Sequence, residues 1–192
     1  MKKNTLVLAL SLALTGLVST AASAATVAGG SINFEGEVTD QTCLINGQAP
    51  NGAVDLNVKL EPVSVSELSH AGATAKPKDF TITLGGDNDL NCANGKVASV
   101  SFDSSSPAIN GMTGWLSNTV AEDVAAENVQ IQILNKETSN VINLLSGNNN
   151  YTPKTIANNT AVFEYVGQYV AVGGAASAGK VASSVKYNIV YQ

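Results

Sequence analysis

The sequence contains no arginine and only one histidine, His70. Charged residues make up 13% of its 192 residues, well below the usual quarter, which suits a surface that becomes covered in an assembly. Without the bidentate fork of arginine, and with more acidic than basic side chains, the chain lacks the basic stripe that a phosphate backbone requires. The composition therefore argues against nucleic acid and anionic membrane surfaces as partners.

Groups that could perform catalysis are scarce. His70 lies near Glu67 and two serines, so a Ser–His–carboxylate arrangement stays open on residue types alone. However, no Gly-x-Ser-x-Gly elbow accompanies it. We predict that the chain is not an enzyme.

Two further motifs could each mark a ligand-binding site, but we interpret both as structural. Residues 87–91 match the start of a calcium loop, but Cys92 stands where that loop needs glycine and Ala98 where it needs glutamate. Trp115 could stack on a sugar in a lectin-like site, although a lone tryptophan more often packs in a core or anchors an interface. We predict no metal and no cofactor.

The only two cysteines are Cys43 and Cys92. No Cys-x-x-Cys spacing is present, so we predict a disulfide and an oxidising compartment. Such a link closes a loop of about fifty residues and contributes roughly 4 kcal/mol in the chain-entropy model.

The first 24 residues are typical of a secretory signal peptide. Lys2 and Lys3 precede an apolar run at residues 6–18, and Ala22-Ser23-Ala24 forms an A-x-A cleavage signal. The run is too short to span a membrane. We expect a mature chain that begins at Ala25, with a net charge of about −7 because 8 lysines then face 15 acidic residues.

The mature chain consists of short segments with alternating apolar and polar residues, which predict strands. These segments are residues 54–60, 80–84, 98–102 and 129–133. Residues 162–170 are apolar on both faces and therefore predict a central strand. Residues 181–191 predict the last strand, whose odd positions are apolar except for Ser183. The pattern indicates one all-β domain, an immunoglobulin-like sandwich of about seven strands.

Residues 25–37 follow the predicted cleavage site directly and have their own alternation. Ala28, Gly30, Ile32 and Phe34 share one strand face. Apolar residues at a free terminus become a liability unless something covers them. Periodicity leaves two alternatives open: this segment packs as the first strand of its own sandwich, or it inserts into a neighbouring molecule.

Both termini resemble the structural subunits of chaperone–usher fimbriae. The run Gly29-Gly30-Ser31-Ile32-Asn33-Phe34-Glu35-Gly36-Glu37-Val38 before Cys43 resembles the start of a major pilin. At the other end, Tyr191 is penultimate and Gly179 is fourteenth from the end, as in that family. Residues 60–63 and 76–80 resemble type 3 major fimbrial subunits, and the start of the chain resembles the type 1 subunits too.

The resemblance implies an incomplete sandwich, which a donated strand completes. Residues 25–37 would be the donor extension and residues 38–192 the pilin domain. Ala28, Gly30, Ile32 and Phe34 would enter the groove of the next subunit by strand addition, a mode for which pilins are a named example. The acceptor groove and chaperone-binding strand would include Gly179, Val185, Tyr187, Ile189 and Tyr191.

The resemblance also implies partners and a location. The partners are other copies of the chain in a head-to-tail polymer, other fimbrial subunits, a periplasmic chaperone and an outer-membrane usher. The product is a fimbria at the cell surface that supports adhesion or biofilm formation. A minor adaptor or adhesive subunit of the same fimbria, and a monomeric secreted β-sandwich that binds a ligand, stay open as alternatives.

Overall fold

The computed structural model describes residue 31 and residues 43–146 and 152–192. The chain divides into two compact units, Met1–Glu37 and Val38–Gln192, and the fold below is that of the second. The signal segment and the predicted donor residues Ala28, Gly30, Ile32 and Phe34 lie outside the described residues.

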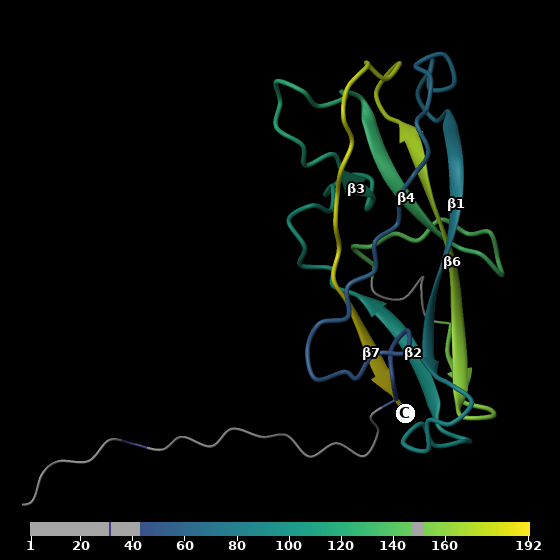
Figure 1. Ribbon diagram of the computed structural model, residues 1–192. Coiled ribbons are helices and arrows are strands. Elements are labelled where there is room, and N and C mark those ends of the chain that lie inside the picture. Colours follow the sequence, from purple (N-terminus) through teal and green to yellow (C-terminus); the bar gives the residue numbers. More distant parts are fainter. Residues whose placement is uncertain (1–30, 32–42, 147–151) are drawn as a thin grey trace, which may run out of the picture. The chain divides into compact units, whose positions relative to one another are not determined.

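Two antiparallel sheets make up the fold, and the described residues contain seven strands and no helix (Figure 1). The first sheet has the order β1-β6-β4-β3, with strands Thr74–Gly85, Thr160–Ala171, Val129–Asn135 and Leu116–Ser117. The second has the order β5-β2-β7, with strands Lys154–Thr155, Val97–Phe102 and Tyr187–Tyr191. The prediction of an all-β sandwich of about seven strands is confirmed.

β6 is the central strand of the larger sheet, as its apolar residues on both faces predicted. On one side Phe163 lies opposite Ile82 of β1, and on the other Gly167 lies opposite Ile133 of β4. Both backbone edges of β6 are therefore paired, which satisfies its peptide groups away from water.

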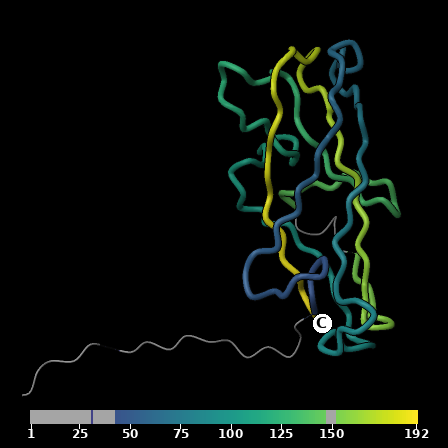
Figure 2. The backbone as a smooth tube through the Cα atoms, in the orientation of Figure 1, coloured from purple at the N-terminus to yellow at the C-terminus, as the bar shows by residue number. Residues whose placement is uncertain are grey.

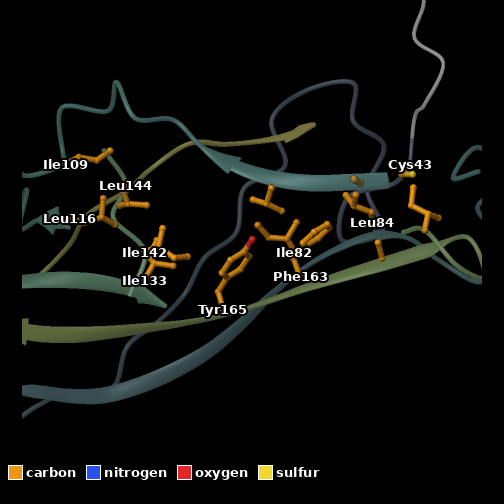
Figure 3. Close-up of a cluster of buried hydrophobic side chains, with 14 of the residues drawn as sticks. Cys43, Ile82, Leu84, Ile109, Leu116, Ile133, Ile142, Leu144, Phe163 and Tyr165 are labelled. Carbon is orange, nitrogen blue, oxygen red and sulfur yellow. The ribbon is translucent and has the colours of Figure 1, made fainter. Parts of the chain in front are cut away.

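The main core lies between the two sheets (Figure 3). Phe163 and Tyr165 of β6 are each 1% exposed. The Tyr165 ring stacks on Phe80, with 5.4 Å between ring centroids, and meets Phe102 edge-on at 5.5 Å. Each such buried side chain contributes roughly 1.5–3 kcal/mol through removal of apolar area from water.

The disulfide joins Cys43 to Cys92 at one end of this core, as predicted, with 4.4 Å between the Cα atoms. Asp89 supports it: its carboxylate accepts the backbone N–H groups of Leu44 at 2.7 Å and Asn91 at 3.2 Å. The residues that resembled a calcium loop therefore form a polar turn that ties the disulfide to the chain.

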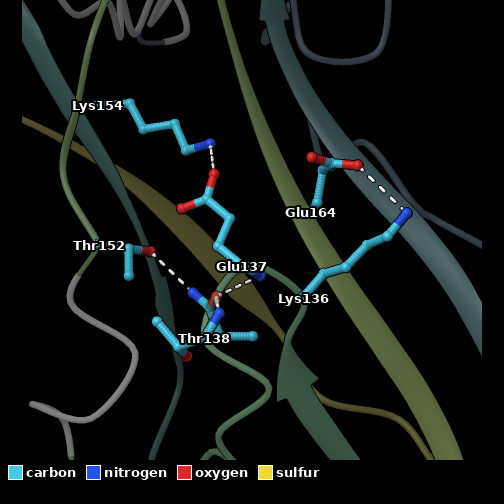
Figure 4. Close-up of polar contacts among 7 residues, drawn as sticks. Lys136, Glu137, Thr138, Thr152, Lys154 and Glu164 are labelled. Atoms are coloured by element: carbon cyan, nitrogen blue, oxygen red, sulfur yellow. Dashed lines mark hydrogen bonds and ion pairs between the residues drawn. The ribbon is translucent and has the colours of Figure 1, made fainter.

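Ion pairs on the outer surface join β1, β6 and the end of β4, and Figure 4 shows the pairs of Lys136 with Glu164 and of Lys154 with Glu137. Lys136 Nζ lies 2.7 Å from Asp79 Oδ2 and 3.4 Å from Glu164 Oε1. Hydrogen bonds to Asp79 and then Glu164 raise the pKa of the Lys136 ammonium group. Lys154 pairs with Glu137 nearby. Such exposed pairs orient side chains and add little to stability.

One predicted strand is absent. Residues 54–60 have the expected alternation, but they form no strand, because a strand is defined by its ladder and this segment has no ladder partner among the described residues. We call residues 53–61 the wall segment.

Candidate functional site: an open groove beside the last strand

The last segment, residues 181–191, presents two different faces. Its odd-numbered side chains are partly buried and its even-numbered ones are exposed. The aromatic and aliphatic residues predicted for the acceptor groove pack against the main core: Val185, Tyr187, Ile189 and Tyr191. The structure thus brings four of the five predicted acceptor residues onto one face.

The backbone of this segment is paired along one edge. Asp103 N–H donates to Lys186 C=O at 2.9 Å, and the backbone N–H of Gln192 donates to Val97 C=O at 2.8 Å. In an antiparallel ladder, successive residues direct their N–H and C=O groups to opposite edges. The odd-numbered residues of β7 therefore direct their backbone groups away from β2, and within the described residues β7 is an edge strand.

The wall segment runs beside this open edge (Figure 2). No backbone–backbone hydrogen bond joins it to the described part of the chain. Its anchors are Val54, which is 7% exposed, and Leu60, which packs against the smaller of the two cores. Between these anchors, Leu56 and Val58 are 37% and 36% exposed. Two apolar segments therefore lie side by side with unpaired backbone.

Among the described residues, one side-chain hydrogen bond joins the last strand to the wall segment. The hydroxyl of Tyr187 donates to Val54 C=O at 2.7 Å. Burial, and then the charge of Asp55, raise the pKa of this phenol. Tyr191 lies four residues on, and its pKa is also raised by burial and the charge of Asp89, while the N–H of Cys43 hydrogen-bonds to its hydroxyl and opposes the rise.

A pocket of about 210 Å³ lies beside the smaller core, near the start of the last segment. Pro62 to Val65, which follow the wall segment, and Ala176 to Gly179 both contribute to it. Its lining also includes Leu68, Ala126, Val129, Tyr169 and Val181. The lining contains polar and apolar groups in similar measure.

Gly179, the fifth predicted acceptor residue, lies at the start of the last segment. It is exposed and does not pack in a core. A Cβ atom there would lie 2.3 Å from Ala126 N and 2.4 Å from Ala125 C. Glycine is therefore required because the backbone of residues 125–126 approaches closely, as the parallel bridge between Ala125 and Lys180 indicates.

The rival motifs form no reactive centre. His70 is exposed, and its Nδ1 lies 3.3 Å from Ser69 Oγ, whereas the Glu67 carboxylate binds Lys76 at 3.2 Å. Trp115 is half-buried, and its C=O accepts the N–H of Asn110 at 2.8 Å, which closes a turn. The described residues contain no cluster of His, Cys, Asp and Glu side chains that could bind a metal. Among the same residues no helix is long and apolar enough to cross a membrane.

The family model described as "Fimbrial protein" matches residues 32–192. The chain belongs to the fimbrial protein family. Its curated relatives include the F17 fimbrial protein of Escherichia coli, 36% identical over 92% of this chain and 96% of the relative. The major fimbrial subunit SMF-1 of Stenotrophomonas maltophilia is 35% identical over 91% and 99%. The type-1 fimbrial protein A chain of E. coli K12 is 34% identical over the full length of both.

Solved structures of fimbrial subunits share the fold. A subunit of a chaperone–usher pilus matches with a TM-score of 0.55 at 22% identity, over 89% of this chain and 100% of that one. The P pilus rod subunit PapA matches with a TM-score of 0.53 at 20% identity, over 79% and 99%. The chain is therefore a fimbrial subunit whose immunoglobulin-like fold is shared with solved pilus subunits, and this family is structural, not enzymatic.

Sequence reasoning missed two parts of the groove. It assigned residues 54–60 to a paired strand, and it gave no role to the Tyr187 hydroxyl. Tyr187 and Val54 are 133 positions apart, and no pattern in the sequence links them. The signal in the sequence was indirect. The wall segment has the alternation of a strand, so its lack of a partner among the described residues indicates that it could pair with an added strand.

Proposed function

We propose that this fimbrial subunit polymerises into surface fimbriae by donating its N-terminal strand to the groove of a neighbouring copy. The donor is residues 25–37, with Ala28, Gly30, Ile32 and Phe34 toward the acceptor. The observation that carries the proposal is the pair of apolar segments with unpaired backbone, the wall segment and β7.

Physical chemistry explains why a strand fits there. An added strand supplies hydrogen-bond partners for both open edges at once, while its alternate side chains cover the apolar floor formed by Val185, Tyr187 and Ile189. Burial of Ile32 and Phe34 would contribute roughly 1.5–3 kcal/mol each. Each copy gives one strand and receives one, so the contact is head-to-tail and propagates into a fibre.

The proposal includes the route of assembly. A subunit with an open apolar groove is prone to aggregation, so a periplasmic chaperone covers the groove until an outer-membrane usher passes the subunit to the growing fimbria at the cell surface. Gly179 and Tyr191 belong to the part of the chain that this chaperone contacts. The assembled fimbria, with its other subunits, supports adhesion or biofilm formation.

Deletion of residues 25–37 tests donation. The deleted chain is expected to be exported and to bind the chaperone, but to form no fibres by electron microscopy of cells that also express the export partners. Phe34→Lys in the full chain should act likewise. A matched control is Ser31→Ala with Asn33→Ala, because both residues share the opposite face of the predicted strand.

Two outcomes would overturn the proposal. Normal fibres from the deletion variant would show that the strand is not donated. A sharp monomer band of the wild-type chain in an unboiled detergent gel, with no high-mass ladder, would indicate a monomeric secreted protein.

A minor adaptor subunit is the second candidate. The minor fimbrial subunit HifD of Haemophilus influenzae is 35% identical over 84% of this chain. Abundance distinguishes the two candidates: a rod subunit dominates the protein of purified fimbriae, whereas an adaptor is present in a few copies per fibre.

A further inference from the structure

We propose that Tyr187 is a positioning residue that holds the wall segment in place, so that the groove is ready to accept a strand. The inference rests on the proposed function, since it assigns a role within the same groove. It concerns the hydroxyl group alone, and not the apolar ring that lines the groove.

The wall segment has few attachments. Among the described residues, the Tyr187 hydroxyl makes the one hydrogen bond that reaches residues 53–61. The charged and polar side chains of Asp55, Asn57 and Lys59 are exposed. At one end the wall segment is held by the burial of Val54 and by the Tyr187 contact, and at the other by the packing of Leu60.

The position of Tyr187 suits this role. Its ring packs against the main core, while its hydroxyl reaches the buried residue Val54, where the exposed part of the wall segment begins. The contact is made by a side chain on the core face of β7, so it leaves the backbone edge of β7 open. A strand can pair with that edge while the hydrogen bond persists.

Tyr191 provides an internal comparison. It lies on the same face of β7, and its hydroxyl accepts the N–H of Cys43. The disulfide to Cys92 already fixes Cys43, so the Tyr191 contact adds little constraint. No covalent link fixes Val54, so the Tyr187 contact adds a constraint on the wall segment beyond the burial of Val54 and the packing of Leu60.

An ordered wall segment lowers the entropy lost when a strand binds, because the residues that pair with the strand are already in place. Loss of the Tyr187 hydroxyl should therefore slow strand uptake and weaken it. It should leave the disulfide and the main core unchanged.

Limited proteolysis with trypsin tests the first step. Lys59 is exposed in the wall segment and is followed by Leu60. Tyr187→Phe should accelerate cleavage after Lys59 by roughly threefold to tenfold, the factor expected for one ordinary hydrogen bond. Tyr191→Phe is the matched control. It should change the rate less than twofold, because the disulfide already fixes Cys43, the residue that the Tyr191 hydroxyl contacts.

Cleavage after a second lysine, Lys96, serves as the reference for cleavage after Lys59. The bond after Lys59 lies inside the loop closed by the disulfide, so its cleavage separates fragments only on a reducing gel. Lys96 is exposed outside that loop, and cleavage after it reports general loosening of the fold. Equal acceleration at Lys59 and Lys96, or none at Lys59, would contradict the proposal.

Strand uptake tests the second step. A fluorescent synthetic peptide of residues 25–37 is mixed with the mature chain purified as its complex with the chaperone, which keeps the copies from filling one another's grooves, and fluorescence anisotropy gives the rate of strand uptake. Tyr187→Phe should bind the peptide roughly threefold to tenfold more slowly than wild type and Tyr191→Phe. If wild type and both variants bind at equal rates, or if Tyr187→Phe binds faster, the role of Tyr187 is wrong. If wild type does not bind the peptide, the proposed function fails instead.

Discussion

β6 and the last segment are both apolar along the chain, yet they have different environments. β6 lies between β1 and β4, and its Phe163 and Tyr165 are each 1% exposed. The last segment pairs along one edge only, and its apolar side chains remain partly buried.

The difference shows that burial here is set by the number of neighbouring strands. Leu56 and Val58 of the wall segment are as apolar as Ile82 and Leu84 of β1, but they are more than a third exposed because none of the described strands pairs beside them. Within the described residues, one side of the sandwich is closed by paired strands, and the other side has an edge strand with unpaired backbone.

The largest expected effect separates the closed side from the open side. Phe163→Ala should lower the free energy of unfolding by about 3–5 kcal/mol, because it leaves a cavity in a closed core. Ile189→Ala should lower it by only about 1 kcal/mol, because a partly exposed side chain removes less apolar area from water on folding. Urea denaturation of the chain without residues 25–37, which cannot fill the groove of a neighbouring copy, measures both values.

The donor strand should reduce this difference. When the peptide of residues 25–37 fills the groove, Ile189 becomes buried, and Ile189→Ala should then cost about 2–5 kcal/mol. The Phe163→Ala value should not change. Equal costs for the two substitutions in the chain without peptide would mean that the open side is already closed.

The sequence predicted the closed side better than the open one. The apolar residues of both faces at 162–170 predicted a central strand, and the odd positions of 181–191 predicted the face that packs on the core. Both patterns depend on local alternation, which a sequence displays directly. Because the chain has only two cysteines, each had only one possible disulfide partner within the chain.

Alternation cannot report whether a partner strand exists. Residues 54–60 and 80–84 have the same pattern, but only the second segment lies in a strand, because β6 pairs with it. The hydrogen bond from Tyr187 to Val54 depends on how two distant segments meet, so it required the folded structure. The sequence therefore predicted which side chains of the last segment share the face that packs on the core. It did not predict that the wall segment lies beside them.

Gly179→Ala tests the start of the last segment and should have an intermediate effect. Its Cβ would meet main-chain atoms of Ala125 and Ala126 within 2.5 Å, and these cannot rotate away. We expect a loss of about 1–3 kcal/mol in the free energy of unfolding, as for other overpacked sites. Thermal or urea denaturation provides the measurement.

Gly174→Ala is the matched control for Gly179→Ala. It lies in the turn that precedes the last segment, and its Cβ would meet nothing closer than the Asn128 side chain at 3.8 Å. It should change the stability by no more than about 0.5 kcal/mol, as is usual for surface substitutions. If both variants are equally stable, the close approach at Gly179 does not restrict the chain.

The smallest effect concerns pH. Burial raises the pKa of Tyr187 and Tyr191 above the ordinary value of 10.0. Above that pH the unfolded chain loses these phenol protons before the folded chain does, so the unfolded state binds fewer protons and stability falls as pH rises. Below pH 10 the contribution of both groups is fully present. Urea midpoints measured from pH 8 to 11 should therefore stay constant and then decline.

The double variant Tyr187→Phe and Tyr191→Phe should show a shallower decline, because two of the titrating groups are gone. A decline as steep as in the wild type would assign the alkaline loss to other groups. Addition of the peptide of residues 25–37 should leave the onset of the wild-type decline unchanged but make the decline larger and extend it to higher pH, since a strand over the groove buries both phenols further and raises their pKa in the folded state alone. Phe163, on the closed side, serves as the comparison. The peptide should not alter the change in the free energy of unfolding that Phe163→Ala causes, at any pH.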